Sequence, residues 1–157
     1  MTLSSTAPAP DFVLPDSAGR AVALRDLLVR GSVVAVFYRG HWCPYCRRYL
    51  GKLQSAHARL LEWGVGLVAI SPEPPATSAR LADELGLTFP LLCDAAGDTI
   101  DRYCARNRLT RGRTILPHPA VFVIDPGGVV RFRSIDRDFK RRTTMRSIFR
   151  AIDAMRG

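Results

Sequence analysis

Apolar and polar residues follow two different periods along the chain. Continuous apolar runs at Ser32–Tyr38, Val65–Ile70 and Ala120–Ile124 predict strands that are covered on both faces. Between the first two runs, apolar residues from Pro44 to about Trp63 recur with a 3.6-residue period, which predicts a long helix. The chain therefore passes directly from a buried strand into a helix.

Shorter patterns fill the remainder of the chain. Turn-forming residues separate short apolar pieces, which predicts one hairpin near the N-terminus and another near the C-terminus. This order implies one α/β domain over residues 1–157, with a central mixed sheet flanked by helices and a loose arm at residues 1–10. The other elements we expect are strands at Phe12–Leu14, Ala21–Leu24, Phe89–Cys93 and Val129–Ile135, helices at Arg25–Leu28, Ala76–Leu85, Asp98–Ala105 and Thr143–Met155, and a loop at Arg106–Pro119.

Composition and charge limit the partners and the cellular location that we expect for the protein. The formal net charge is +9 and arginine carries nearly all of it, since Lys52 and Lys140 are the only lysines. No aromatic-basic motif accompanies this charge, so we expect a solvated surface and no nucleic-acid partner. No apolar stretch approaches the ~20 residues of a membrane span, and the N-terminus lacks the pattern of a signal peptide. These features predict a cytoplasmic protein without a membrane partner, whose thiols are kept reduced.

Cys43 and Cys46 lie where the first apolar run gives way to the helical pattern. Side chains three residues apart on a helix lie ~5–6 Å from each other, so this pair can close a disulfide with little movement. Pro44 suits the first helical position, which places Cys43 at the N-cap, where free N–H groups and the helix dipole favour a thiolate. The pattern predicts a redox-active pair that attacks a disulfide or peroxide. Further positive potential would come from the neighbouring basic residues Arg39, His41, Arg47 and Arg48.

The residues alone allow two other interpretations of the cysteine pair. Structural zinc needs four Cys or His ligands, usually as two close pairs, and Cys93 and Cys104 do not form a second pair. An inert buried pair is the other reading, and the proline at the helix start argues against it. We expect no metal and no cofactor. Cys93 and Cys104 are interpreted as small buried apolar residues, with a distant resolving thiol as the alternative.

Aromatic and histidine side chains near the pair also have two readings. Trp42 would either form a wall that contacts a partner or pack as a partly buried core residue. His41 would either stabilise the thiolate or lie exposed in its loop, and we favour the second. His118 precedes Pro119 and approaches the sulfurs only if the fold brings its loop there. His57, inside the long helix, is expected to be structural.

Several short motifs follow one another in a specific order: Pro10-Asp-Phe-Val-Leu-Pro-Asp, Phe37-Tyr, Ile70-Ser-Pro-Glu, Leu85-Gly-Leu-Thr-Phe-Pro-Leu-Leu-Cys-Asp and Pro119-Ala-Val-Phe-Val-Ile-Asp-Pro-Gly-Gly. With the cysteine pair after the central strand, this order resembles the thioredoxin superfamily. More narrowly, it resembles the peroxiredoxin-like redoxins of the alkyl hydroperoxide reductase/thiol-specific antioxidant (AhpC/TSA) family, from about Ala9 to the closing helix. The resemblance implies a thioredoxin-like fold and a thiol-dependent antioxidant enzyme.

The site departs from the peroxiredoxin pattern. When the family's Pro-x-x-x-Thr/Ser-x-x-Cys motif is laid on Phe37-Tyr38, Arg39 falls at the proline, Cys43 at the threonine and Cys46 at the peroxidatic cysteine. That overlay implies attack by Cys46, whereas the thioredoxin pattern implies attack by Cys43. We favour Cys43, because a capping residue is usually more exposed and reactivity needs access.

Other positions match thioredoxin-like proteins instead. The peroxiredoxin arginine before the later strand is absent, and Pro119 there matches the cis-proline that lies beside the disulfide in thioredoxin-like proteins. The segment Cys43-Pro44-Tyr45-Cys46 also matches the glutaredoxin site, which keeps glutathione open as a reductant.

We therefore predict an oxidoreductase that reduces hydroperoxides or protein disulfides through a Cys43–Cys46 disulfide. A thioredoxin- or glutathione-type donor would supply the electrons. Peroxiredoxins often form dimers, so the resemblance makes a homodimer possible, although no feature of the sequence marks an interface. The alternative is a non-catalytic redox sensor or binding module that the same disulfide switches. The residues predicted to support the two cysteines are Trp42, Pro44, Tyr45, Pro119, His41 and Arg39.

Overall fold

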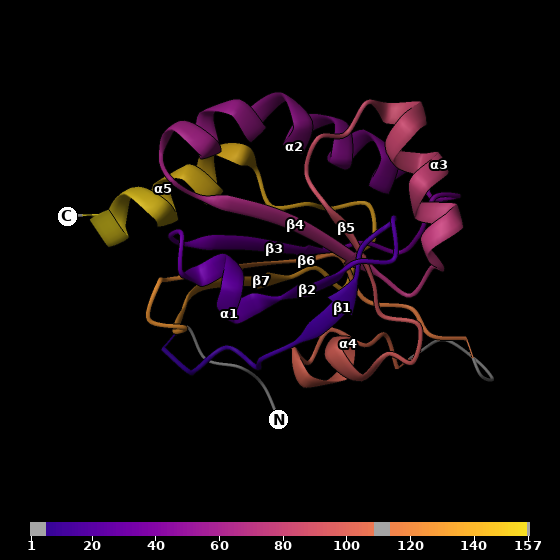
Figure 1. Ribbon diagram of the computed structural model, residues 1–157, viewed down its shortest axis with the longest axis horizontal. Coiled ribbons are helices and arrows are strands. Elements are labelled where there is room, and N and C mark those ends of the chain that lie inside the picture. Colours follow the sequence, from indigo (N-terminus) through magenta and orange to yellow (C-terminus); the bar gives the residue numbers. More distant parts are fainter. Residues whose placement is uncertain (1–5, 109–113, 157) are drawn as a thin grey trace.

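A five-stranded mixed sheet lies at the centre of the computed structural model, which describes residues 6–108 and 114–156 (Figure 1). The strand order is β5-β4-β3-β6-β7; β4 and β5 run parallel to β3, and β6 runs antiparallel to both β3 and β7. This sheet confirms the predicted fold class. The strands are β3 (Val33–Phe37), β4 (Gly66–Ser71), β5 (Leu91–Cys93), β6 (Ala120–Ile124) and β7 (Val130–Ile135).

Helices cover both faces of the sheet, which is why the central strand β3 is buried along its whole length. Side chains alternate along a strand, so Val34 and Val36 enter one core while Val33 and Phe37 enter the other. The first core lies under α2 (Pro44–Glu62), α3 (Pro75–Leu85) and α5 (Met145–Arg156). The second lies under α1 (Leu24–Leu28), α4 (Asp98–Arg102) and the predicted N-terminal hairpin of β1 (Val13–Pro15) and β2 (Ala21–Ala23).

The N-terminal arm is bonded to the fold from Ala7 onward. Ala9 N–H donates to Gly128 O and Val130 N–H donates to Ala7 O, each at 2.8 Å. Pro8 lies between these two bonds, where its missing N–H is not needed. The prediction of a loose arm is therefore wrong for residues 7–10, and residues 1–5 lie outside the described ranges.

Helix α2 begins at Pro44, as predicted, and α4 is shorter than predicted. The chain at Cys104 adopts φ +58°, a left-handed conformation that prevents α4 from continuing to Ala105. Tyr49, on α2, donates its hydroxyl to Thr143 O at 2.6 Å and so ties α2 to the segment before α5. None of the helices in the described part of the chain is both long and apolar enough to cross a membrane.

Candidate active site

The cysteine pair lies at the N-terminus of α2, a few residues after β3 ends. Cys43 is the N-cap, with φ −89° and ψ 114°, and Pro44 occupies the first turn, as predicted. The backbone N–H of Cys46 donates to Cys43 Sγ at 3.4 Å, so the sulfur takes the place of the oxygen that usually caps a helix. The two cysteines lie 3.0 Å apart at their closest approach, and both are free thiols with no disulfide between them. Little movement is needed to bridge them.

Both cysteines are buried, each with 1% of its surface exposed. The expectation that Cys43 is the more exposed of the two is therefore wrong. The turn before α2 carries Cys43 into the core under that helix, where it shares a cluster with Tyr38, Cys46 and Leu50. A reagent reaches either sulfur only when neighbouring side chains move.

The two thiols have opposite pKa shifts. Burial disfavours ionisation of Cys43, but hydrogen bonds with the Cys46 thiol and backbone N–H, together with nearby positive charge, hold the pKa of Cys43 below its ordinary value. Burial and the contact with Cys43 raise the pKa of Cys46. Since the thiolate is the reactive form of a cysteine, the two thiols differ in reactivity, and Cys43 is the more readily ionised of the two.

Two donors converge on the sulfur of Cys46. The backbone N–H of Arg39 lies 3.4 Å from Sγ, and Nη2 of Arg142 lies 3.3 Å from it. The other terminal nitrogen of Arg142 donates to the carbonyls of Phe139 and Arg141, which fixes the guanidinium. Sequence reasoning missed Arg142, because it lies 96 residues from Cys46 in an arginine-rich segment that reads as a solvated surface. No local pattern marks it.

An aromatic wall, defined here as Trp42, Tyr45 and Phe139, stands next to the pair. The guanidinium of Arg39 lies between two of its rings, 4.9 Å from Trp42 and 4.6 Å from Phe139. Tyr45 packs edge-on against Phe139 with ring centroids 5.6 Å apart. Trp42 is 49% exposed and Phe139 is 39% exposed. Trp42 is therefore a surface residue rather than a core aromatic.

His41 pairs with Glu73 rather than with a cysteine. Its backbone N–H donates to Glu73 Oε1 at 2.8 Å, and its Nδ1 contacts Glu73 Oε2. Arg47 donates to His41 O at 3.1 Å and to Glu84 Oε2 at 2.7 Å. Both basic side chains thus hold the turn before the pair, and the ring of His41 is half exposed, in line with the favoured interpretation. Glu73, which anchors this turn, was not anticipated.

The peptide bond before Pro119 is trans, since the described residues contain no cis peptide bond. The cis-proline that the resemblance implied is therefore wrong. The trans isomer of an X-Pro bond is the more stable by roughly 0.5–1 kcal/mol, and here Pro119 leads straight into β6 while its carbonyl accepts Asp136 N–H at 2.8 Å. His118 donates its N–H to Ala105 O, and burial together with Arg137 and Arg39 lowers the pKa of its ring.

The remaining cysteines differ from each other. Cys93 is buried, its Sγ lies 3.6 Å from Ser78 Oγ, and burial raises the pKa of its thiol, in agreement with an inert interior residue. Cys104 is half-buried, so the prediction of burial is wrong for it; the left-handed turn after α4 brings it toward the surface. His57 is buried with Nδ1 2.8 Å from Thr88 Oγ1, which confirms its structural role.

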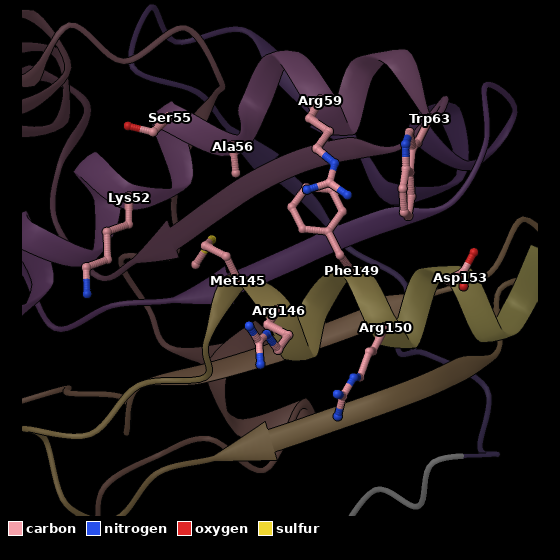
Figure 2. Close-up of a pocket in the computed structure, with 10 residues that line it drawn as sticks. All are labelled: Lys52, Ser55, Ala56, Arg59, Trp63, Met145, Arg146, Phe149, Arg150 and Asp153. Atoms are coloured by element: carbon pink, nitrogen blue, oxygen red, sulfur yellow. The ribbon is translucent and has the colours of Figure 1, made fainter.

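Two hollows lie along the outer side of α2 and α5. The smaller, of about 350 Å³, is lined by Tyr49 and by Arg142, whose Nη2 in turn lies 3.3 Å from Cys46 Sγ. The larger, of about 850 Å³, follows the seam between the two helices, with Lys52 and Met145 at one end and Trp63 at the other (Figure 2). The lining of neither hollow includes a cysteine.

Comparisons with known proteins agree with this geometry. The sequence matches the AhpC/TSA family over residues 6–133. It is 33% identical over 124 residues to thiol-disulfide oxidoreductase ResA of Halalkalibacterium halodurans, covering 77% of this chain and 68% of that protein. Over 124 residues it is 32% identical to a Mycobacterium tuberculosis protein provisionally named a peroxiredoxin, covering 78% of each.

The chain spans about two thirds of the length of the ResA relatives that it matches. The crystal structure of peroxidoxin BcpB from Mycobacterium tuberculosis superposes with a TM-score of 0.84 at 24% identity, covering 98% of this chain and 97% of that one. At this identity the superposition shows a shared fold.

Proposed function

The chain belongs to the AhpC/TSA family, and from this premise we propose that it is an oxidoreductase that cycles between a Cys43–Cys46 dithiol and a disulfide. The observation that carries the proposal is the pair itself. The two cysteines approach to 3.0 Å at the start of α2, and their surroundings lower the pKa of Cys43 while raising that of Cys46. One thiol is thus prepared to attack and the other to resolve.

Reduction of a disulfide is the reaction that this arrangement supports best. The Cys43 thiolate attacks one sulfur of the substrate, forms a mixed disulfide, and expels the other sulfur as a thiolate that takes up a proton. Cys46 then loses its proton and attacks the Cys43 sulfur, which closes the Cys43–Cys46 bond. The substrate leaves as a dithiol with two electrons gained.

Reduction of a hydroperoxide is the second candidate, and the donors around Cys46 favour it. Arg39 N–H and Arg142 Nη2 both point at this sulfur and would stabilise a thiolate or an attacked peroxide oxygen there. Attack on one oxygen breaks the O–O bond, which gives a sulfenic acid and an alcohol. Condensation with Cys43 then forms the disulfide and releases water.

The oxidised pair must be reduced again by an outside donor. We place a thioredoxin- or glutathione-type thiol in this role, because thiol–disulfide exchange regenerates the dithiol without a bound cofactor. A cytoplasmic location fits the proposal, since thiols are kept reduced there.

Activity measurements on cysteine variants test the proposal. Wild type, Cys43→Ser and Cys46→Ser are compared for reduction of insulin disulfides and of hydrogen peroxide, with Cys93→Ser as a control thiol. We expect Cys43→Ser to abolish insulin reduction, Cys46→Ser to accumulate a mixed disulfide, and Cys93→Ser to behave as wild type. A wild type that reduces neither substrate faster than free cysteine would leave only the redox sensor.

Alkylation identifies the attacking thiol. The reduced protein is treated briefly with iodoacetamide at mildly acidic pH, and the labelled peptides are mapped. We expect label on Cys43, because its pKa is the lower of the two. Preferential label on Cys46 would reverse the assignment and favour the peroxidatic order.

A further inference from the structure

The smaller hollow is lined by cations. Within the described residues, no acidic side chain belongs to its lining, and none of its cations forms an ion pair. Arg48 and Lys52 come from α2, whereas Lys140 and Arg142 come from the segment before α5. Because these four charges meet around one concave surface whose lining contains no carboxylate, the hollow favours an anion.

A polar atom in the same lining lacks a partner. The hydroxyl oxygen of Thr143 is buried and has no hydrogen bond in the described part of the chain, and only 9% of the residue is exposed. A buried hydroxyl without a partner is destabilising, so a ligand group that reached it would be stabilised by the new hydrogen bond. Tyr45 and Tyr49 complete the lining with aromatic surface. The hollow therefore combines positive charge with aromatic walls, and one of its lining residues carries a buried hydroxyl without a partner.

Arg142 connects this hollow to the redox pair. Its side chain lines the hollow, and its Nη2 lies 3.3 Å from Cys46 Sγ. A carboxylate that pairs with this guanidinium would draw Arg142 away from Cys46, whose surface is otherwise only 1% exposed. An anionic ligand bound here would thus move the side chain that lies between the hollow and the bond that must be reduced.

We propose that this hollow binds a small thiol that carries carboxylate groups, together with its disulfide form, as the electron donor for the Cys43–Cys46 pair. The inference rests on the proposed dithiol–disulfide cycle. A volume of about 350 Å³ lies at the lower end of the range for small-ligand sites and suits a ligand of tripeptide size rather than a protein partner.

The reaction follows from the position of the hollow. The bound thiolate attacks Cys46, the sulfur next to Arg142, and forms a mixed disulfide while Cys43 leaves as a thiolate. Cys43 is suited to leave, since its pKa is the lower of the two. A second thiol attacks the mixed disulfide, Cys46 leaves and takes up a proton, and the donor departs as a disulfide. Two thiols lose two electrons and the protein pair gains them.

The larger groove shares Lys52 with the hollow but differs from it in its other cations (Figure 2). Arg59 lies over Phe149 at 4.3 Å, closer than the hollow's Lys140 lies to Phe139 (5.9 Å) or its Arg142 to Tyr49 (6.0 Å). The lining also contains Asp153, a negative charge. Arg146 and Arg150 line this groove and not the hollow, so they provide a matched control for loss of charge.

Stopped-flow oxidation of the reduced protein tests the inference. The probes are oxidised glutathione, which is an anionic disulfide, and cystamine, which is a cationic disulfide of simpler structure. The variants are Arg48→Ala with Lys140→Ala, and the control Arg146→Ala with Arg150→Ala. We expect the ratio of the glutathione rate to the cystamine rate to fall about fivefold in the first pair and to stay within about twofold of wild type in the control.

The outcomes separate this inference from the proposed function. Equal ratios in both double variants, or a wild type that prefers cystamine, would overturn the anion site while leaving the redox cycle intact. A wild type that reacts with neither probe and reduces neither insulin nor peroxide would remove the proposed function and this inference together. Mass spectrometry of Cys43→Ser after oxidised glutathione should show the adduct on Cys46, and its absence there would refute the order of attack.

Discussion

Replacement of Arg142 by methionine isolates the contribution of one distant cation to the redox pair. The guanidinium donates Nη2 to Cys46 Sγ at 3.3 Å and is fixed by the carbonyls of Phe139 and Arg141. Methionine keeps an unbranched apolar side chain similar in length to the arginine stem but removes the charge and the donor. In a Cys43→Ser background, Cys46 is the only thiol of the pair, so the effect on its ionisation is measured directly.

The separation sets the size of the effect. A unit charge 3.3 Å from a thiolate stabilises it by about 1.3 kcal/mol even at the dielectric constant of water, and a partly buried site screens less than water does. That free energy corresponds to roughly a tenfold change in rate. The sign follows from the charge: removal of a cation raises the pKa of Cys46, so less thiolate is present at neutral pH and alkylation slows.

Iodoacetamide alkylation as a function of pH measures this change. We expect the Arg142→Met profile to move to higher pH, with a rate at pH 7 at least about tenfold below that of the Cys43→Ser parent. Arg141→Met is the matched control, because Arg141 is the neighbouring residue, 81% exposed, and 3.9 Å from Asp138 rather than near a cysteine. Superimposable profiles for the two arginine variants would refute the argument.

Two further predictions concern stability. Gly31→Ala should lower the free energy of unfolding by about 3 kcal/mol, because φ is +149° and the new Cβ would lie 2.2 Å from Gly64 O. Urea unfolding measures this change, with Gly51→Ala as the control. Gly51 lies on α2 and its new Cβ would meet nothing within 4 Å, so this variant should raise the free energy of unfolding by up to about 1 kcal/mol. Equal stabilities of the two variants would contradict the prediction. Asp125→Asn should destabilise the protein at pH 7. Burial raises the pKa of Asp125, but hydrogen bonds from Val129 N–H and Arg131 outweigh burial and hold the pKa below its ordinary value, so the carboxylate stabilises the folded state. That contribution to stability is complete above about pH 4 and is lost as the pH falls through the lower pKa of the folded state. Urea unfolding curves of wild type and variant should therefore differ at pH 7 and converge at acidic pH. A difference in stability that does not change with pH would contradict the prediction.

The passage from strand to helix at the site could be predicted from local residues. An unbroken apolar run needs cover on both faces, and Pro44 can only stand in the first turn of a helix, so β3, the cap at Cys43 and the start of α2 followed from the sequence. These features depend on neighbours in the chain. A mixed sheet flanked by helices was implied by the order of elements, because parallel strands require long crossovers that are usually helical.

The surroundings of the sulfurs could not be predicted in the same way. Arg142 reaches Cys46 only after α5 has packed beside α2, a long-range arrangement that leaves no periodic signal. Exposure of Cys43 was judged from its place at a cap, whereas the tertiary packing decided it. His41 was considered for the thiolate because it is close in sequence, yet Glu73, 32 residues away, engages it.

The exposed position of Trp42 gives the protein a built-in optical reporter. The chain has two tryptophans, and Trp42 directly precedes Cys43 while stacking on Arg39. Trp63 lies at the far end of α2, about 28 Å along the helix, where Arg59 and Arg156 cover its ring. In a Trp63→Phe variant, tryptophan emission would therefore come only from the indole beside the redox pair. Intrinsic fluorescence of that variant would follow the dithiol and disulfide forms in real time, without a label or an auxiliary enzyme.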